Sequence, residues 1–570
     1  MMNTKVSSKQ GKQSKMQSCM AFIEKVGNKL PSPSLMFVYI SVFVLILSAV
    51  LGSMGVVAQT ELGTFPINNL LGQKPIEVLK VTASGTAVAE TYSNGLSYIV
   101  GSIIKNFMGM SALGAILIIM LAIGVMEQSG YLSIGIQSIV KSTPAKLVTP
   151  VVIFIGVMSN IASDAGYVVL IPLAALVYYT LGRNPMVGLA AGFAGVSGGF
   201  SANLLIGSFD ALLIPFTQAA AETGDALMGT NFAPALQTTS NMFFLMASTF
   251  VIVIVGTIII DKIVEPSMGK YDRSEADVVE KTGDLTPQEK KAFKAANMSL
   301  LGVIVFIVLT VLPFDTNNVI PIVGDLSTTV PMTSISSEGT MSLSNPLGFL
   351  NSLFFSGDMI MMLMFFVFLV PGIVYGFKSG TFKTKDDVIG AMITSMKSMA
   401  SIIVILFFVA QFLNFFNDSH LGIFIASVGA DLVSKIPTDS TLTGMLLMIA
   451  FIWFTAFVNL FIAGGTSKYG LLAPIFIPIL MSAGFSPAGI QLMYRIGDSS
   501  TNIISPLMSY MGVIVVFGQK YKKDFGIGNL MGMMLPLSIG FLIAWTIFAV
   551  VWALAGAPIG PGQFFLMNQY

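Results

Sequence analysis

Apolar residues run without strand-like alternation through several stretches of this chain, each long enough to cross a lipid bilayer. A membrane-spanning helix needs roughly 20 predominantly apolar residues, and continuous runs indicate helices rather than the alternating strands of a membrane barrel. These runs cover residues 36–56, 243–260, 298–313, 359–377, 399–416, 444–463 and 531–556. The pattern predicts an all-α polytopic membrane protein.

Two other regions share a pattern of shorter apolar segments broken by proline, glycine, serine and asparagine. In each region two asparagines stand 43 residues apart and two prolines stand 13 residues apart. The landmarks are Asn160, Pro172, Pro185 and Asn203 in the first region, and Asn459, Pro474, Pro487 and Asn502 in the second. Apolar segments of about a dozen residues do not cross a bilayer comfortably, so we expect an internal repeat of re-entrant hairpins followed by broken helices. Such paired interruptions in two halves mark the binding sites of transporters.

The composition agrees with a membrane location and excludes several classes of site. Only 10% of the residues are charged and the mean hydropathy is +0.83, whereas soluble domains carry about 25% charge. The net charge of +1 gives no indication of a nucleic-acid partner. Cys19 is the only cysteine, so neither a disulfide framework nor a cysteine metal site is expected. The first apolar segment is long enough to span and lacks a cleavage pattern, so we expect no signal peptide.

The distribution of lysine and arginine predicts the orientation, because basic residues favour the cytoplasmic side. They are concentrated in the N-terminal tail and in the mixed-charge segment 261–294, and they are absent from 314–345 and from 557–570. The N-terminus is therefore expected inside and the C-terminus outside. The predicted organisation is a basic tail over 1–30, a first membrane half over 31–263, a cytoplasmic connector over 264–297, a second membrane half over 298–556 and an external tail over 557–570.

Two charges near the end of the chain are the strongest candidates for a functional site. Arg495 and Asp498 stand one helical turn apart in an apolar stretch, where they can partly neutralise each other. A charge at mid-bilayer costs roughly 2.5–3.5 kcal/mol on insertion scales, and such residues usually face a cavity. Arginine binds carboxylates, and an aspartate can ligate a cation or take up a proton. The polar run 499–502 favours a ligand site over a purely structural ion pair.

Acidic and amide side chains elsewhere extend this candidate site. Asp164 and Asp210 are the matching acids of the first half, although either can also stand at a loop end at the membrane surface. Hard cations prefer oxygen ligands, so the amide and carboxylate side chains of these segments could form a sodium site. The alternative is that the same side chains only form polar contacts between helices. The candidate ligands of the sodium site are Asn160, Asn203, Asn459, Asp498 and Asn502.

Two further motifs have a functional and a bland interpretation. The segment GGTSKYG at 464–470 contains Thr466 and Tyr469; its helix start can receive an anion and Tyr469 can stack on an aromatic ligand, but a plain hairpin tip fits equally well. The segment GVSG at 195–198 matches intramembrane serine proteases, with Ser197 and the only histidine, His420, as the required pair. The repeat already explains these glycines, so we expect no enzyme, and no nucleotide-binding motif is present.

Four motifs together resemble the p-aminobenzoyl-glutamate transporter (AbgT) family. They are FIEKVGNKLPSPSLMFVY at 22–39, SNIASDAGYVVLIPLAAL at 159–176, GFAGVSGGFSANLLIGSFDALL at 192–213 and YRIGDSSTNIISPLMSYMG at 494–512. The resemblance implies a bowl-shaped homodimer in a bacterial inner membrane, with about nine transmembrane helices and two re-entrant hairpins per subunit arranged as inverted repeats. It also implies a secondary transporter for p-aminobenzoyl-glutamate uptake or sulfonamide export.

The resemblance also implies roles for individual residues. The polar pocket of the family corresponds to Thr466, Pro487, Arg495, Asp498 and Pro506, and its cation site includes Asn459 and Asn502. Its first-half acid matches either Asp210 or Asp164. Tyr469 stands where the family pattern has a tryptophan after lysine, which keeps an aromatic face but changes its chemistry.

The resulting hypothesis is alternating access driven by a Na⁺ or H⁺ gradient, with no other cofactor. Arg495 would hold a carboxylate, Tyr469 would pack on an aromatic ring, and hairpin tips at 161–166 and 463–468 would close over the site. A dicarboxylate or other organic-anion carrier of similar fold is the main alternative, followed by an anion channel and an intramembrane protease.

Overall fold

The computed structural model describes most of the membrane region but not every segment. The described residues are 31–60, 63–81, 87–110, 113–160, 166–272, 285–311, 333–335, 341–343, 357–434, 441–462 and 464–570. The predicted basic tail and the hairpin tip with Asp164 lie outside these residues. Part of the predicted connector lies outside them too, and α12 begins at Pro287, within that predicted connector.

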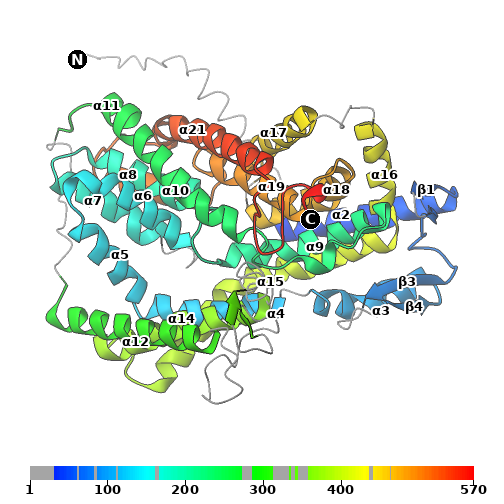
Figure 1. The fold of residues 1–570 in the computed structure, drawn as a ribbon, viewed down its shortest axis with the longest axis horizontal. Coiled ribbons are helices and arrows are strands. Elements are labelled where there is room, and N and C mark those ends of the chain that lie inside the picture. The colour runs from blue at the N-terminus through cyan, green and yellow to red at the C-terminus, as the bar shows by residue number, and fades with distance from the viewer. Residues whose placement is uncertain are drawn as a thin grey trace, which may run out of the picture.

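Seven helices of the described part are long and apolar enough to cross a membrane, and each overlaps one of the seven apolar runs. A bent pair, α4 (Leu113–Gln128) and α5 (Tyr131–Ser142), adds an eighth if it counts as one broken span. The seven are α2 (Pro33–Ser53), α10 (Met242–Ile259) continued by η6 (Ile260–Val264) and α11 (Glu265–Met268), α12 (Pro287–Val311), α14 (Gly357–Ser379), α15 (Lys385–Asp418), α17 (Thr441–Val458) and α21 (Ile527–Leu554). The predicted helical membrane architecture is confirmed (Figure 1).

The two regions with matched landmarks fold into matched series of elements. The first consists of α6 (Val148–Ser159), η3 (Gly166–Leu170), α7 (Ile171–Thr180), α8 (Pro185–Phe193) and η4 (Ala194–Gly198). The second consists of α17, α18 (Gly465–Ser482) and α19 (Pro487–Asn502). Both series then continue through an irregular stretch into a further helix, α9 (Ser208–Met228) or α20 (Met511–Gln519). Pro185 and Pro487 each begin a helix, where a missing N–H costs nothing.

A close backbone approach fixes α6 against η4 in the first half. A Cβ on Gly195 would lie 2.5 Å from the backbone oxygen of Ile153 and 3.0 Å from Gly156 Cα. Only glycine permits such a crossing. Asn160 follows Gly156 by four residues at the end of α6. The crossing therefore fixes the position of Asn160 relative to η4.

The second half repeats this crossing between α17 and α19. A Cβ on Gly497 would lie 2.0 Å from Thr455 Oγ1 and 2.4 Å from the backbone oxygen of Ile452. Asn459 follows four residues after Thr455, as Asn160 follows Gly156. The asparagine landmarks therefore stand at equivalent places beside the two broken helices.

The turn that precedes each broken helix is held in place by hydrogen bonds to a later segment of the chain. In the first half, Arg183 bonds Glu265 at 2.5 and 2.9 Å and Asp261 at 2.9 Å. In the second half, Ser486 N donates to Phe565 O at 2.9 Å and Met567 N donates to Gly484 O at 2.8 Å. The predicted C-terminal tail is thus packed against the turn before α19, and Phe565 is fully buried.

Three small antiparallel hairpins were missed by the all-α prediction. They pair β1 (Val57–Thr60) with β2 (Gly63–Pro66), β3 (Ile76–Val81) with β4 (Ala87–Tyr92), and β5 (Thr333–Ile335) with β6 (Met341–Leu343). The first two lie beside α3 (Gly95–Met108) and α16 (Leu421–Ser434) at one end of the molecule (Figure 1). Their strands are three to six residues long and therefore too short to span a membrane.

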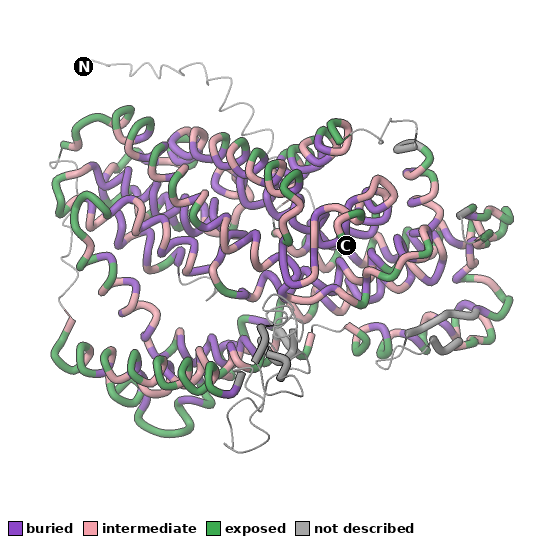
Figure 2. The backbone as a smooth tube through the Cα atoms, viewed as in Figure 1, coloured by how far each residue is buried: buried purple, intermediate pink, exposed green. Residues whose placement is uncertain are grey.

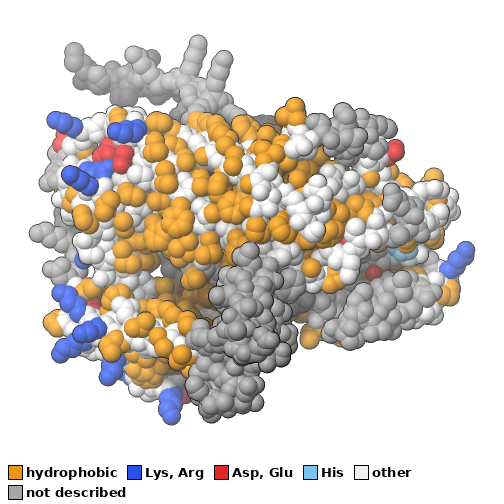
Figure 3. All heavy atoms as spheres, viewed as in Figure 1, with side chains coloured by type: hydrophobic (Ala, Val, Ile, Leu, Met, Phe, Trp, Pro, Cys, Tyr) orange, Lys and Arg blue, Asp and Glu red, His pale blue; other side chains and the backbone are white. Residues whose placement is uncertain are grey.

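Burial separates the site-bearing elements from the outer helices. Figure 2 shows the buried chain concentrated where α6, α8 and α19 lie, whereas α12 is exposed along much of its length. Figure 3 shows apolar side chains covering the outer face around α10 and α21, with lysine and arginine gathered at the edge near α11 and the first turns of α12. The exposed apolar faces suit lipid, and they leave α19 as the most enclosed polar segment.

Candidate functional site

Helix α19 is polar in sequence but lies inside the protein. Every residue from 487 to 501 is buried, and Arg495 and Asp498 are only 2% and 1% exposed. Proline at its first position and the Ser486 Oγ cap, which accepts from Gly489 N at 3.0 Å, define where it begins. Arg495 and Asp498 therefore need oppositely charged partners inside the protein, because unpaired buried charges are strongly unfavourable.

Arg495 pairs with an acid from the first half of the chain. Its Nη1 atom forms a buried ion pair with Asp210 Oδ1, and its guanidinium lies 5.4 Å from the ring centroid of Phe209. Asp210 stands in the first turn of α9, where its Oδ2 accepts from Gly207 N at 2.7 Å. Of the two candidate first-half acids, Asp210 contacts Arg495. Asp164 lies outside the described residues, so the choice between the two acids stays a prediction.

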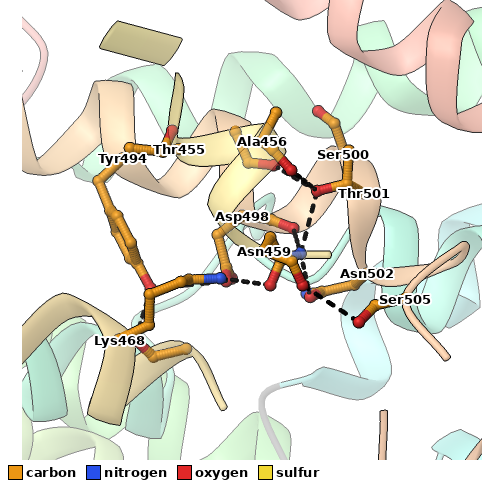
Figure 4. Close-up of polar contacts among 12 residues, drawn as sticks. Thr455, Ala456, Asn459, Lys468, Tyr494, Asp498, Ser500, Thr501, Asn502 and Ser505 are labelled. Atoms are coloured by element: carbon orange, nitrogen blue, oxygen red, sulfur yellow. Dashed lines mark hydrogen bonds and ion pairs between the residues drawn. The ribbon is translucent and has the colours of Figure 1, made fainter. Parts of the chain in front are cut away.

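Asp498 pairs with Lys468 at the start of α18. Lys468 Nζ lies 2.5 Å from Asp498 Oδ1 and also donates to Asn459 Oδ1 (Figure 4). The Lys468 side chain is fully buried, with 0% exposure. Asp498 Oδ2 has no hydrogen-bond partner among the described residues. One oxygen of this carboxylate is thus left to receive another group.

Asn459 holds the end of α17 to the end of α19. Its Nδ2 lies 2.7 Å from the Asp498 backbone oxygen, 3.0 Å from Thr501 Oγ1 and 2.9 Å from Asn502 Oδ1. Ser505 Oγ donates to the Asn459 backbone oxygen at 3.1 Å (Figure 4). The second-half members of the predicted sodium site are therefore brought together, with carboxylate, amide and hydroxyl oxygens, the ligand types that hard cations prefer.

The first-half asparagines gather around Gly207. The Asn160 backbone oxygen, Asn203 Nδ2 and Asp210 Oδ2 lie 3.6, 3.7 and 3.6 Å from the place that a Cβ on Gly207 would take. Asn160 Oδ1 is buried without a hydrogen-bond partner in the described part of the chain. A crevice without room for a water molecule lies beside this cluster and is lined by Asn203, Asp210, Ile206, Thr238 and Met242 among others. Each half thus places two asparagines next to one acid.

Tyr469 is enclosed by protein on all sides. Its ring centroid lies 4.6 Å from that of Tyr494, and its hydroxyl is 2.7 Å from Thr217 Oγ1. Gln491 donates to the same Thr217 oxygen at 2.9 Å and accepts a hydrogen bond from Asn241. A series of hydrogen bonds therefore runs from the start of α10 through α19 and α9 to Tyr469, the residue expected to pack on an aromatic substrate.

The remaining predicted residues lie at the ends of the site elements. Thr466 is half-buried in the first turn of α18, Pro487 begins α19, and Pro506 is half-buried in the irregular stretch after α19. Pro487 lies two turns from Arg495 along the helix, so it positions the helix start rather than touching the charges.

One expectation is wrong and several residues were missed. Arg495 and Asp498 do not neutralise each other; each pairs with a charge from another element, because both are buried and a better partner is available across the helix interface. Lys468 was overlooked as a site residue, although it is the only charged residue between positions 441 and 494. Gln491 could have been noticed as a polar residue one turn before Arg495. No feature of the sequence marked Thr217 as a site residue.

The protease alternative finds no support in the geometry. Ser197 Oγ donates to Met508 Sδ at 3.3 Å, while His420 Nδ1 lies 2.8 Å from the Pro66 backbone oxygen near β2. The two residues have different neighbours and form no catalytic pair.

For the transporter that the sequence predicts, replacing Gly465 with alanine should reduce uptake of the transported solute without unfolding the protein. The new Cβ would lie 2.9 Å from Phe209 Cζ and 3.2 Å from Asp498 Oδ2, so it crowds both ion pairs. Since a flexible ring can yield, we expect a cost of about 1–2 kcal/mol, or about tenfold in uptake at low substrate. Uptake into proteoliposomes measures this. Gly528→Ala is the control, because nothing lies within 4 Å of its Cβ position; equal uptake by the two variants would contradict the prediction.

Comparison with known protein families gives a match over nearly the whole chain. Residues 18–567 match the AbgT putative transporter family. The p-aminobenzoyl-glutamate transport protein of Escherichia coli (strain K12) is 32% identical over 543 residues, which are 95% of this chain and 96% of that protein.

Two solved structures have the same fold. The YdaH transporter of Alcanivorax borkumensis, described as having an unusual topology, aligns with a TM-score of 0.77 and 35% identity over 93% of this chain and 100% of that one. MtrF of Neisseria gonorrhoeae, described as illuminating a class of antimetabolite efflux pumps, aligns with a TM-score of 0.72 and 35% identity over 94% and 97% of the two chains.

Proposed function

Because this chain belongs to the AbgT putative transporter family, we propose that it is a secondary active transporter of p-aminobenzoyl-glutamate or a related aromatic carboxylate. Transport would be coupled to a Na⁺ or H⁺ gradient and would proceed by alternating access. The E. coli relative, named for p-aminobenzoyl-glutamate transport, supports the substrate class.

The observation that carries this proposal is the pair of buried ion pairs on α19. Arg495 with Asp210 and Lys468 with Asp498 place two cations and two anions inside a membrane protein. Such groups are expensive in a membrane and usually mark substrate or ion pathways. Both pairs include a residue of α19 in the second half, and the Arg495–Asp210 pair joins this helix to α9 of the first half. Transporter sites form where two repeated halves meet.

The chemistry of the side chains assigns their roles in the proposal. In the proposal a substrate carboxylate takes the place of Asp210 on Arg495. A guanidinium suits this role because it offers several donors in a planar fork. Tyr469 and Tyr494 provide aromatic faces for a ring. Asp498, Asn459 and Asn502 sense the coupling cation through their oxygens.

Alternating access would come from movement of α18 and its counterpart against α19. Gly464 precedes α18 with φ of +88°, a conformation that glycine adopts without strain. Movement there would expose Lys468, Tyr469 and the ion pairs to one side of the membrane.

A second candidate is export of antimetabolites such as sulfonamides, favoured by the similarity to MtrF. It needs the same site and differs in direction and substrate. A dicarboxylate or other organic-anion carrier would also use Arg495, and an anion channel would use it without coupling.

The proposal includes a bacterial inner-membrane location with the N-terminus in the cytoplasm and the C-terminus outside. Lysine and arginine gather at the edge of the molecule beside α11 (Figure 3). This supports a cytoplasmic location for that edge, because basic residues favour the cytoplasmic side. We also propose a homodimer, with the lipid bilayer and a small aromatic carboxylate as the other partners.

Uptake of labelled p-aminobenzoyl-glutamate into proteoliposomes tests the proposal. An inward Na⁺ gradient, or else a proton gradient, should drive accumulation above the external concentration by the wild-type protein. Asp498→Asn should lose the stimulation by the gradient, because the substituted amide carries no charge to bind the ion. Asp431→Asn, which changes an exposed carboxylate on α16 in the same way, is the matched control and should behave as wild type.

Other outcomes would refute parts of the proposal. Equal downhill flux with and without a gradient would favour a channel. Gradient-driven flux of a dicarboxylate, with none of p-aminobenzoyl-glutamate, would identify the organic-anion carrier instead. Efflux of a sulfonamide from loaded vesicles, without uptake, would favour the exporter.

A further inference from the structure

The Lys468 ammonium lies where a metal cation would find its best ligands. Nζ is bonded to Asp498 Oδ1 at 2.5 Å and to Asn459 Oδ1, one carboxylate and one amide oxygen. Hard cations prefer such oxygens. The proposed function assigns these oxygens to a coupling ion, yet it gives the lysine that touches them no role.

A merely structural role explains Lys468 poorly. A buried ion pair is often no more stabilising than packed apolar residues, because both charges lose their hydration. Lys468 is nevertheless fully buried and is the only charge between residues 441 and 494. It also lies in the first turn of α18, three residues after Gly465, and the two glycines at 464 and 465 give this end of the helix backbone freedom.

The charges of the site make two cations at these oxygens mutually exclusive. Arg495, Lys468, Asp210 and Asp498 form two ion pairs whose charges sum to zero. A metal ion added while the ammonium stays would be an unmatched buried charge, which is strongly unfavourable. One of the two cations must therefore leave.

The oxygens remain in place without the lysine. Asn459 is held through Nδ2 by Asn502 Oδ1 at 2.9 Å and by Thr501 Oγ1 at 3.0 Å, so its Oδ1 stays directed toward Asp498. Asp498 Oδ2 has no partner among the described residues and supplies a further ligand atom. Tyr494, whose ring lies 5.6 Å from Nζ, provides a π-face that keeps an ammonium nearby.

The geometry points to Lys468 as a tethered cation that leaves Asp498 Oδ1 and Asn459 Oδ1 when a monovalent metal ion such as Na⁺ binds there, and returns when it departs. This inference rests on the proposed cation coupling and adds the residue that competes with the ion. With Lys468 in place the carrier keeps a neutral site without an ion, so its ion-free form can change conformation without exposing a buried carboxylate.

A titration without substrate tests the competition. The thermal stability of the detergent-purified protein is measured against Na⁺, with choline keeping the ionic strength constant. Lys468→Gln should reach half-maximal stabilisation at an at least about tenfold lower Na⁺ concentration than wild type, because the ion no longer displaces a charge-assisted hydrogen bond. Lys468→Gln combined with Asp498→Asn should show no stabilisation by Na⁺. Equal half-maximal concentrations in Lys468→Gln and wild type would overturn the inference.

Chemical labelling of the wild-type protein tests the displacement itself and needs no folded variant. Reductive methylation with formaldehyde, followed by mass spectrometry, reports whether the Lys468 amine is accessible. Methylation should be at least about tenfold faster in Na⁺ than in choline, since the ion shifts the population toward the released side chain. Exposed Lys105 on α3, paired with Glu90, is the internal control and should react equally in both salts. A Lys468 rate that does not depend on Na⁺ would overturn the inference.

The two levels of the argument fail separately. Gradient-driven uptake by wild type, with a Na⁺ titration unchanged in Lys468→Gln, would refute the role of Lys468 and leave the transporter. Absence of gradient-driven uptake would refute the proposed coupling, while titration and labelling of the purified protein would still decide whether Lys468 competes with Na⁺.

Discussion

Arg495→Gln is expected to abolish transport and to destabilise the protein strongly. The substitution removes the proposed carboxylate ligand and leaves Asp210 buried without its cation. Breaking one partner of a buried pair costs about 3–5 kcal/mol, and loss of a charged substrate contact of similar size would reduce uptake more than about a hundredfold. Uptake into proteoliposomes and the thermal midpoint in detergent measure the two effects.

The double variant Arg495→Gln with Asp210→Asn separates substrate binding from packing. It removes both charges and keeps shapes close to the originals, so stability should return to within about 1 kcal/mol of wild type. Uptake should stay lost. Recovery of uptake along with stability would mean that the pair serves only to hold α9 against α19.

Gly497→Ala is expected to prevent α19 from reaching its place. The added Cβ would lie 2.0 Å from Thr455 Oγ1 and 2.4 Å from the Ile452 backbone oxygen. A hydroxyl can rotate but a backbone oxygen cannot, so the cost should reach about 3 kcal/mol, the upper end for overpacking. Because Gly497 lies between Arg495 and Asp498, a shift of about 1 Å there should also reduce uptake about a hundredfold. The yield of monodisperse protein and its thermal midpoint measure the first effect.

Two companion variants make the Gly497 result specific. Gly444→Ala, on α17 with nothing within 4 Å, should be neutral or stabilising by up to about 1 kcal/mol, since alanine is the better helix former. Thr455→Ala in the Gly497→Ala background removes the nearest clashing atom and should recover only part of the loss. A fully stable Gly497→Ala protein would contradict the close crossing of α17 and α19.

The spanning helices and the repeat were predictable because they depend on local pattern. Continuous apolar runs, proline positions and asparagine spacing are read along the chain, and all seven runs became helices. The same logic failed for the hairpins β1–β2 and β3–β4. Their strands are only four to six residues long, and a search for runs long enough to span a membrane passes over such short segments.

The charge partners could not be predicted because they come from distant parts of the sequence. Spacing suggested that Arg495 and Asp498 face each other on one helix, but the fold supplies Asp210 from 285 residues away and Lys468 from 30 residues away. Helical spacing shows which residues share a face; it does not show what that face meets. Asp210 was a candidate only as one of two first-half acids, and the solitary lysine in an apolar stretch was the clue to the other partner.

The contact between the C-terminal segment and the turn before α19 bears on how the protein is made. Chains emerge from the ribosome N-terminus first, and segments fold in that order. Phe565 and Met567, which bond Ser486 and Gly484, are translated after every helix that carries the ion pairs. Helix α19 therefore waits for a segment translated after α21 before its first turn is clamped. Maturation of the site is a late event in biogenesis, and the insertion machinery must tolerate Arg495 and Asp498 until then.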